Sequence, residues 1–220
     1  MRKYFSLTAA IGSTILLTAQ VHVRDEPRHH NVFENEFVRI LDVHLSPGDT
    51  TLYHLHNTPS VFIIFTNVKV GSQLVNQQPQ HGANVSGEVS YDNIHTPRTH
   101  RVWNDDTSWF HVMDIELTNT KEKLNVPLLR DVALKLLFNE QQVNGYNLEL
   151  KRPANVDLPS SPGGYLLINK SEAVIEFKLN NTVHNRIIKP SHYIWIEAGK
   201  NFSVKLVGNQ TADFVVLQLK

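Results

Sequence analysis

The sequence has no cysteine among its 220 residues. This absence excludes disulfide bonds, thiolate metal ligands and a cysteine nucleophile. Any metal ligand must therefore come from histidine, aspartate, glutamate or the backbone. The chain also has no excess of either charge, because 21 basic residues balance 21 acidic ones. A neutral chain offers no basic surface for nucleic acid or for a membrane, so neither is an expected partner.

Several motifs of common enzyme classes are missing as well. There is no phosphate-binding glycine loop, since the adjacent glycines at 163 and 164 follow Pro162 as in a turn. No Gly-x-Ser-x-Gly motif for a serine nucleophile occurs. Helical periodicity is rare, whereas short apolar runs separated by turn residues recur, which is typical of an all-β protein. Hydrophobic residues make up 41% of the chain, which is enough for a packed core.

Residues 1–20 are predicted to be a signal peptide. Arg2 and Lys3 precede an apolar run that ends in the small residues Thr18 and Ala19, which is the layout of a secretory leader. The run is short for a membrane span, and an uncleaved anchor or a plain apolar start is the alternative. We expect cleavage after Ala19 or Gln20 and a periplasmic or secreted protein with no membrane attachment.

The most informative stretch runs from Pro47 to Phe65. A Pro-Gly turn precedes an extended segment that carries His54 and His56. Residues two apart in a strand point to the same face, so these two imidazoles project together and form half of a transition-metal site. A solvated pair of histidines is the alternative. A second element argues against it, because His100 leads through a short segment into another strand-like run at 109–117.

These two stretches resemble the motifs of the cupin superfamily. Gly48, five residues and then His54-x-His56 match the first motif, and His100, three residues and then Asn104 match the end of the second. The resemblance implies an antiparallel jelly-roll barrel, a double-stranded β-helix, whose mouth holds one metal ion on His54, His56 and His100.

The sequence departs from the family pattern at two places. The usual glutamate ligand would fall at Ser60 or Val61, so the carboxylate is missing. Gly87 lies 13 residues before His100, about two more than in the family. The expected ligand set therefore consists of three histidines and no carboxylate.

The second half of the chain repeats the first. A shift of 105 residues aligns residues 137–150 with 32–45, placing Phe138 on Phe33, and it places Asn209 on Asn104. Such an offset indicates a duplicated fold, so we expect two tandem cupin barrels. The predicted domains are 21–118, with the metal site, and 137–220, joined by a linker at 119–136. The run at 129–137, at the end of that linker, could be a helical turn or two or an extended crossover.

The same shift predicts which barrel holds the metal. His54 falls on Pro159, His56 on Ser161 and His100 on Lys205. The second barrel is therefore expected to be degenerate, with no metal ligands. Other strands are expected at 32–45, 68–74 and 88–94, and a loop at 76–87, which is rich in Gln, Asn, Gly and Pro.

Further residues are candidates for the site or its surroundings. His95 is the first candidate for a fourth ligand or a contact to a ligand, and Tyr53 and Tyr91 are two more candidates beside the motifs, with barrel packing as the alternative. The remaining histidines in the first half are expected to have ordinary roles. We expect hydrogen-bonded or exposed side chains at His44 and His111, and exposed ones at the adjacent positions 29 and 30.

Three neutral imidazoles would leave a divalent ion its full charge and open coordination positions, which suits an anionic or enolisable small molecule. The resemblance implies Fe(II) first, with Mn, Ni, Cu or Zn as alternatives, and a dioxygenase-type oxidoreductase. Isomerase or lyase chemistry stays open. A non-catalytic protein that binds or senses a metal or small ligand is the second hypothesis. The expected partner is a small molecule, with a homodimer as a further option.

Overall fold

The computed structural model describes residues 20–119, 125–151, 154–179 and 182–220. Apart from the 3-10 turn Val23–Asp25, every described element is a β-strand, so the all-β prediction is confirmed. The predicted signal peptide lies outside the described residues except for Gln20. None of the described helical segments is long and apolar enough to cross a membrane.

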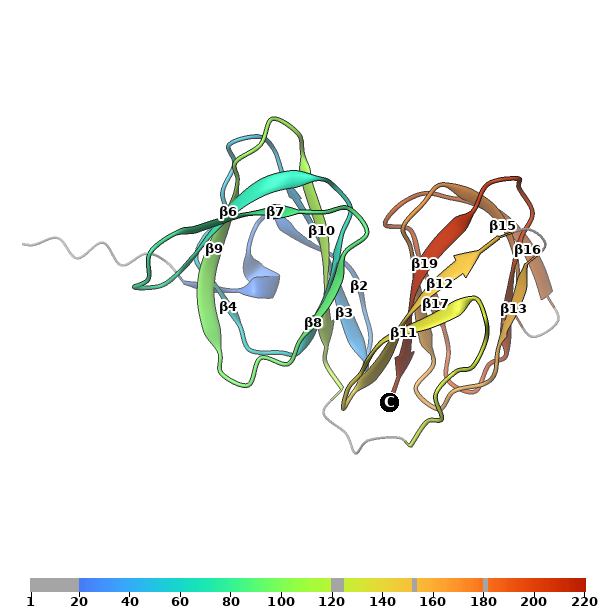
Figure 1. Ribbon diagram of the computed structural model, residues 1–220. Helices are drawn as coiled ribbons and strands as arrows, with labels where there is room; N and C mark the ends of the chain where they lie inside the picture. Colours follow the sequence, from blue (N-terminus) through green and yellow to red (C-terminus); the bar gives the residue numbers. More distant parts are fainter. Residues whose placement is uncertain (1–19, 120–124, 152–153, 180–181) are drawn as a thin grey trace, which may run out of the picture.

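The first barrel consists of two five-stranded sheets, with the orders β1-β4-β9-β6-β7 and β2-β3-β10-β5-β8 (Figure 1). Its strands are β1 (Val21–His22), β2 (His29–Glu34), β3 (Val38–Leu45), β4 (His54–His56), β5 (Ser60–Ile64), β6 (Val68–Leu74), β7 (Gln80–Asn84), β8 (Val89–Asp92), β9 (Arg98–Asn104) and β10 (Phe110–Leu117).

The second barrel has the same plan with a five-stranded sheet, β11-β12-β19-β14-β17, and a four-stranded sheet, β13-β18-β15-β16. Its strands are β11 (Leu134–Asn139), β12 (Val143–Leu150), β13 (Asn155–Leu158), β14 (Tyr165–Asn169), β15 (Ala173–Leu179), β16 (Thr182–Ile188), β17 (Tyr193–Ile196), β18 (Phe202–Leu206) and β19 (Ala212–Leu219). The predicted duplication into two tandem barrels is confirmed.

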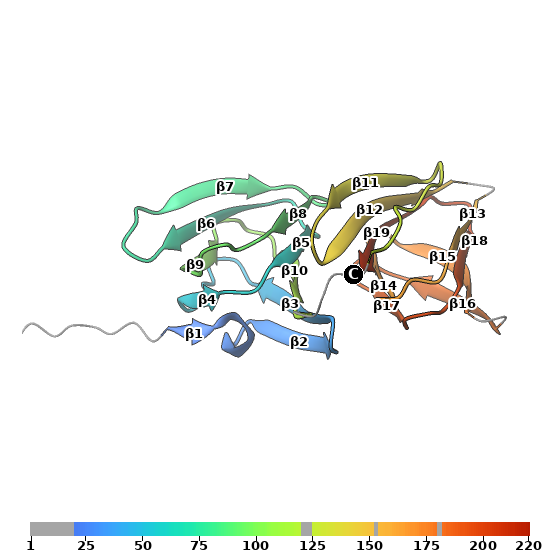
Figure 2. The same cartoon turned by 90° about the horizontal axis from the view of Figure 1, so that it is seen from below.

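The two barrels stand side by side and share a hydrophobic core (Figures 1 and 2). Side chains alternate along each strand. On β3, Val43 and Leu45 face the inside of the first barrel, while Val38 and Ile40 face the second barrel. The shared core takes buried residues from both sides: Val38, Ile40, Val61, Ile63, Met113, Ile115 and Leu117 from the first barrel, and Val143, Leu166, Ile168, Val215, Leu217 and Leu219 from the second.

Equivalent positions of the repeat meet in this shared core. The 105-residue shift relates β3 to β12 and β5 to β14, so Val38 corresponds to Val143 and Ile63 to Ile168. Each of these four residues is completely or almost completely buried. The two barrels thus contact each other through equivalent surfaces, as the two subunits of a symmetric dimer do. The duplication therefore explains how each barrel covers an apolar sheet face.

The shift fails in the later strands, where the alignment made from the sequence is wrong by three residues. Leu74 and Leu179 are equivalent under the shift, yet Leu74 pairs with His100 and Leu179 pairs with Phe202. The counterpart of His100 is therefore Phe202 and not Lys205. The second barrel has a shorter connection before β18, and length changes of this kind are tolerated in loops.

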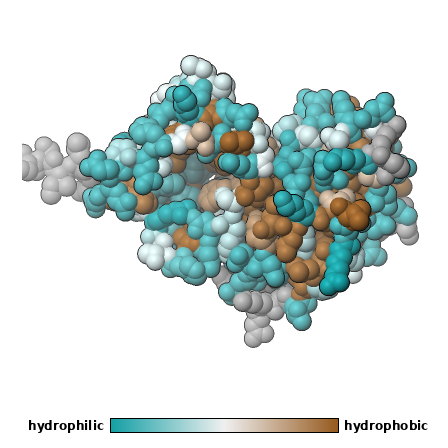
Figure 3. Space-filling model, viewed as in Figure 1, coloured by the Kyte–Doolittle hydropathy of each residue, from teal (hydrophilic) through white to brown (hydrophobic). Residues whose placement is uncertain are grey.

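Two element boundaries also differ from the predictions, and a third segment, which the sequence left open, is now defined. The expected strand at 32–45 is interrupted by a turn, in which Oδ1 of Asn35 accepts hydrogen bonds from the backbone N–H groups of Phe37 and Val38. The expected loop at 76–87 contains the edge strand β7. The run at 129–137 contains no helix: a turn at 132–133 leads into β11, which begins at Leu134. Figure 3 shows hydrophobic surface over the part of the second barrel near β11, where Leu136 and Leu137 are exposed.

Candidate metal centre

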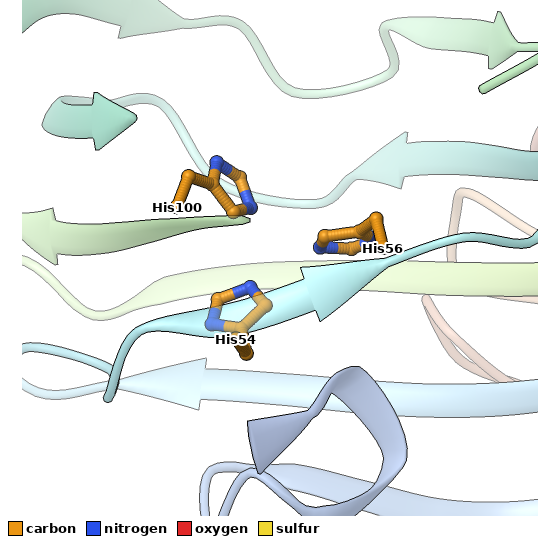
Figure 4. A group of neighbouring side chains, drawn as sticks. All are labelled: His54, His56 and His100. Atoms are coloured by element: carbon orange, nitrogen blue, oxygen red, sulfur yellow. The ribbon is translucent and has the colours of Figure 1, made fainter. Parts of the chain in front are cut away.

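Strands β4 and β9 bring the three predicted histidines together. His54 lies directly opposite His100 in the antiparallel ladder, and His56 is on the same face as His54. The ring centroids of His54, His56 and His100 are 4.7 to 5.0 Å apart. One ligand atom from each ring lies within 4.8 Å of the other two. Figure 4 shows the three rings gathered around one point.

Two other residues of the motifs hold this arrangement in place. Gly48 has a positive φ of 75° in the turn before β4, a conformation that favours glycine. Its N–H donates to the carbonyl of Asn104 at 3.1 Å. The buried side chain of Asn104 donates in turn to the carbonyls of Leu45 at 3.0 Å and Ser108 at 2.7 Å. The glycine and asparagine of the motifs thus fix the loops around the site.

The environment keeps the imidazoles neutral. His54 is 1% exposed and His56 is 2% exposed. Burial lowers the pKa of His54, and burial together with the neighbouring histidines lowers the pKa of His56 further. Burial and the proximity of His54 lower the pKa of His100 to about 3. Neutral imidazole is the form that binds a metal ion, so these residues are ready to bind one at neutral pH.

The hydrogen bonds of the site agree with this role. Nδ1 of His54 donates to the carbonyl of Leu52 at 2.9 Å, which directs its Nε2 away from the backbone. Both ring nitrogens of His56 are buried and lack a hydrogen-bond partner within the described chain. Leaving a buried polar atom unpaired is costly. A metal ion on His56 would remove that cost, so the residues fit a transition metal.

A buried carboxyl group lies beside the histidines and was missed from the sequence. Oδ2 of Asp114, on β10, is 3.7 Å from Nδ1 of His56. Burial, with the neighbouring Glu116, raises the pKa of Asp114 to about 8. The sequence carried a signal for its burial. Val112, Asp114 and Glu116 alternate along a mainly apolar strand, so their side chains share one face. The carboxyl group of Asp114 therefore contacts the Nδ1 side of His56 without forming a hydrogen bond to it.

His29 is also buried at the site, and the prediction that it is exposed is wrong. It is 8% exposed, and its ring centroid lies 4.7 Å from that of His54. Nδ1 of His29 donates to the carbonyl of Val23 at 3.0 Å. Burial and the proximity of His54 lower its pKa to about 3. The 3-10 turn folds back under β4 and provides this contact, which no local pattern could reveal. His30 is exposed as expected.

The histidines lie at one side of a cavity of about 280 Å³ inside the first barrel. Its walls are mainly apolar, and Ser72, Asn84 and Ser90 are among the few polar residues of the lining besides the histidines. Arg98 also lines the cavity and forms an ion pair with Asp92. The apolar part of the lining includes Val43, Leu45, Phe62, Ile64, Val70 and Phe110. Such a space suits a small molecule with one polar end.

The structure does not bring the three other candidates to the site. His95 is exposed, and its Nε2 contacts the side-chain amide of Asn93 at 3.0 Å. The hydroxyl of Tyr53 donates to Gln73 at 2.8 Å. Tyr91 stacks on Phe138 at 5.6 Å and packs against the shared core. None of the side chains of His95, Tyr53 and Tyr91 lines the cavity. Their positions correct the expectation that they contact the ligands.

The two positions of the missing glutamate differ in orientation. Val61 is completely buried in the core shared with the second barrel, so its side chain points away from the cavity. Ser60 faces the other way and donates to the carbonyl of Thr58 at 3.2 Å. At this site the group of close ligands contains histidines alone. The carboxyl group of Asp114, on the other sheet, contacts His56, with its Oδ2 3.7 Å from Nδ1 of His56.

No family model matches this sequence, and no curated protein is similar to it. Solved structures match its fold. A cupin 2 conserved barrel domain protein from Leptotrichia buccalis is 8% identical and has a TM-score of 0.57, covering 87% of this chain and 88% of its own. A salicylate 1,2-dioxygenase from Pseudaminobacter salicylatoxidans is 9% identical with a TM-score of 0.58, covering 83% and 71%. A variant of the oxalate decarboxylase OxdC from Bacillus subtilis is 8% identical with a TM-score of 0.58, covering 87% and 75%.

Proposed function

We propose that this chain, a two-domain cupin by its fold, is a metal-dependent enzyme acting on a small organic molecule, with dioxygenase-type oxidation as its favoured reaction. The observation that carries this proposal is a group of three neutral imidazoles, two of them buried and His100 half-buried, at the side of an apolar cavity. Two of the enzymes that share the fold are named as a dioxygenase and a decarboxylase, which shows that this fold supports such chemistry.

His54, His56 and His100 are the residues that would hold the metal ion. When bound, a redox-active divalent ion such as Fe(II) supplies the electron-transfer chemistry that oxygenation needs. A ligand set of three neutral groups leaves the ion its full charge, which favours an anionic partner. Arg98 adds a second positive charge to the cavity wall. The preferred substrate is therefore a small acid or phenol with an apolar body.

The other residues of the cavity bind and orient. Val43, Phe62 and Phe110 exclude water from the apolar end of the space. Asp114 contacts the Nδ1 side of His56 at 3.7 Å, and His29 packs against His54. These contacts from behind fix the ring orientations of two of the three ligands, which is how a site is kept in a reactive geometry.

The test is metal analysis of protein purified without a histidine tag, followed by oxygen uptake. The iron-loaded chain is incubated with a panel of small carboxylic acids and phenols. We expect uptake with at least one compound, and none from the His54→Gln/His56→Gln variant treated in the same way. Tight binding of a panel member without any uptake or conversion would favour the binding and sensing alternative.

Proton-transfer chemistry is the second candidate, because a buried carboxyl group lines the same cavity. Asp114 contacts the cavity and His56, yet it is separate from the three ligands. An isomerase or lyase needs a group that gives and takes a proton near the metal. Conversion of a panel member without oxygen consumption, lost in Asp114→Asn while the metal is kept, would identify this chemistry.

A further inference from the structure

A second cluster of possible ligands lies on the outer face of the first barrel, away from the cavity. Asp42 and His44 are two apart on β3, so their side chains share a face. His111 of β10 lies directly opposite His44 in the ladder. The neighbours Val43 and Leu45 point the other way, into the barrel. The cluster therefore continues the strand face that carries Ile40 into the shared core.

Both imidazoles of this cluster present the same ring nitrogen to one carboxylate. Nε2 of His111 lies 2.7 Å from Oδ1 of Asp42, and Nε2 of His44 lies 3.0 Å from Oδ2. The two rings are stacked with centroids 4.0 Å apart and an angle of 24° between them. One ligand atom from each of the three side chains lies within 4.8 Å of the other two. Three potential ligands thus converge on one point.

An ordinary ion pair between histidine and aspartate has a different form in this chain. Nδ1 of His81 contacts Oδ2 of Asp105 at 2.7 Å, and a single imidazole is involved. At Asp42, burial alone would raise the pKa, but hydrogen bonds from His111 and His44 hold it below its ordinary value. The carboxylate is therefore ionised at neutral pH. Two imidazoles on one ionised carboxylate make a two-histidine, one-carboxylate ligand set.

We propose that Asp42, His44 and His111 bind a second divalent transition-metal ion, with Zn²⁺ as the best match. Nitrogen and carboxylate oxygen bind zinc at about 2.0 to 2.2 Å, in tetrahedral sites with nitrogens about 3.3 Å apart. A small opening of the stacked rings accommodates that geometry. The side chains of His44, Asp42 and His111 are 37%, 23% and 16% exposed, which leaves room for water as a further ligand. The ion would join β3 to β10 beside the shared core.

The test uses the full-length, metal-free chain and measures bound Zn²⁺ by equilibrium dialysis. We expect the His54→Gln/His56→Gln variant to keep one ion per chain. Adding His44→Gln/His111→Gln to it should remove that ion, while adding His81→Gln, a matched loss of a histidine paired with an aspartate, should not. In the otherwise unchanged chain, Asp42→Asn should weaken one binding event at least tenfold while the circular dichroism spectrum stays the same.

The outcome also separates this site from the first one. An ion that survives in the His54→Gln/His56→Gln variant and disappears with His44→Gln/His111→Gln supports the proposal, whatever the first site binds. If the His54→Gln/His56→Gln variant binds no Zn²⁺, or if His44→Gln/His111→Gln releases none, the second site does not exist. An unchanged affinity in the Asp42→Asn variant would equally overturn the proposed ligand set.

Discussion

In the first barrel the ladder between β4 and β9 places His54 opposite His100, whereas in the second barrel the ladder between β13 and β18 places Leu158 opposite Phe202. Leu158 and Phe202 are buried in the core of the second barrel. Among the described residues of the second barrel, no three ligating side chains lie close together. The same strand pairing therefore supports a ligand cluster in one barrel and hydrophobic packing in the other.

The opposite wall of each barrel shows the same difference, with a polar residue in the first barrel and an apolar one at the equivalent position of the second. Asp114 of β10 pairs with Leu41, and Val216 of β19 pairs with Tyr146 at the equivalent place. Val216 and Tyr146 are both part of the hydrophobic core of the second barrel. Buried polar groups cost stability unless they are paired. The first barrel thus accepts that cost around its cavity, while the second barrel and the shared core supply apolar packing.

The largest effect is expected from removing the ligands that distinguish the first barrel. The His54→Gln/His56→Gln variant should lose one bound metal ion per chain completely, because one remaining histidine cannot hold it. Metal analysis of the dialysed protein checks this. His192→Gln, a change of an exposed histidine in the second barrel, should leave the metal content unchanged. Retention of every ion in the double variant would contradict the assignment of the metal to the first barrel.

These ligands could be predicted from sequence because their cause is local. The parity of a strand places His54 and His56 together, and a second motif supplies His100. Asp114 and His29 could not be found in that way. They reach the site through the pairing of β10 with β3 and through the turn at Val23–Asp25, contacts between segments far apart in the chain. The gap-free shift gave Lys205 where the structure has Phe202 because the second barrel has a shorter connection before β18.

The next largest effect concerns the core that joins the barrels. Ile115 and Leu217 are equivalent positions in β10 and β19, and both are completely buried in the shared core. Ile115→Ala and Leu217→Ala should each lower the free energy of unfolding by about 2 to 5 kcal/mol. Denaturant unfolding checks this by circular dichroism. The exposed Ile187→Ala, on the outer strand β16, is the control and should have little effect.

The unfolding transitions of Ile115→Ala and Leu217→Ala also test whether the two barrels unfold together. A single unfolding transition, shifted by a similar amount in both, would show that the barrels unfold as one unit through their common core. Two transitions, with each variant affecting only one, would show that the barrels are independent. That second outcome would contradict a stabilising role of the shared core for both barrels.

A smaller effect is expected from the carboxyl group that contacts His56. Asp114→Asn keeps the size of the side chain but replaces the carboxyl group whose Oδ2 lies 3.7 Å from Nδ1 of His56. Loss of a residue that contacts a metal ligand, without binding the metal itself, usually weakens metal binding about 10- to 100-fold. Competition with a metal-binding dye measures the affinity. Asp157→Asn, an exposed change in the second barrel, should leave it unaltered, and an equal loss in both variants would argue against the contact.

The smallest effect is the response of the metal-free chain to mild acid. His29 and His100 have a pKa of about 3 in the folded state, because burial disfavours their charged form. Their pKa in the unfolded chain is about 6.5. As the pH falls below 6.5, the unfolded chain takes up protons that the folded chain does not, so stability decreases. The decrease continues until the pH reaches the folded value.

Between pH 7 and pH 6 each of these two histidines should lower the free energy of unfolding by about 0.7 kcal/mol. Urea unfolding of the metal-free protein at both values measures the total change, to which His54 and His56 also contribute because burial lowers their pKa. His29→Gln should reduce this pH dependence by its own share, because the glutamine does not titrate. His184→Gln should not reduce it, since His184 lies on the exposed outer strand β16 of the second barrel, stacked on Phe177. A pH dependence that is unchanged by His29→Gln would mean that His29 is accessible to protons in the folded first barrel.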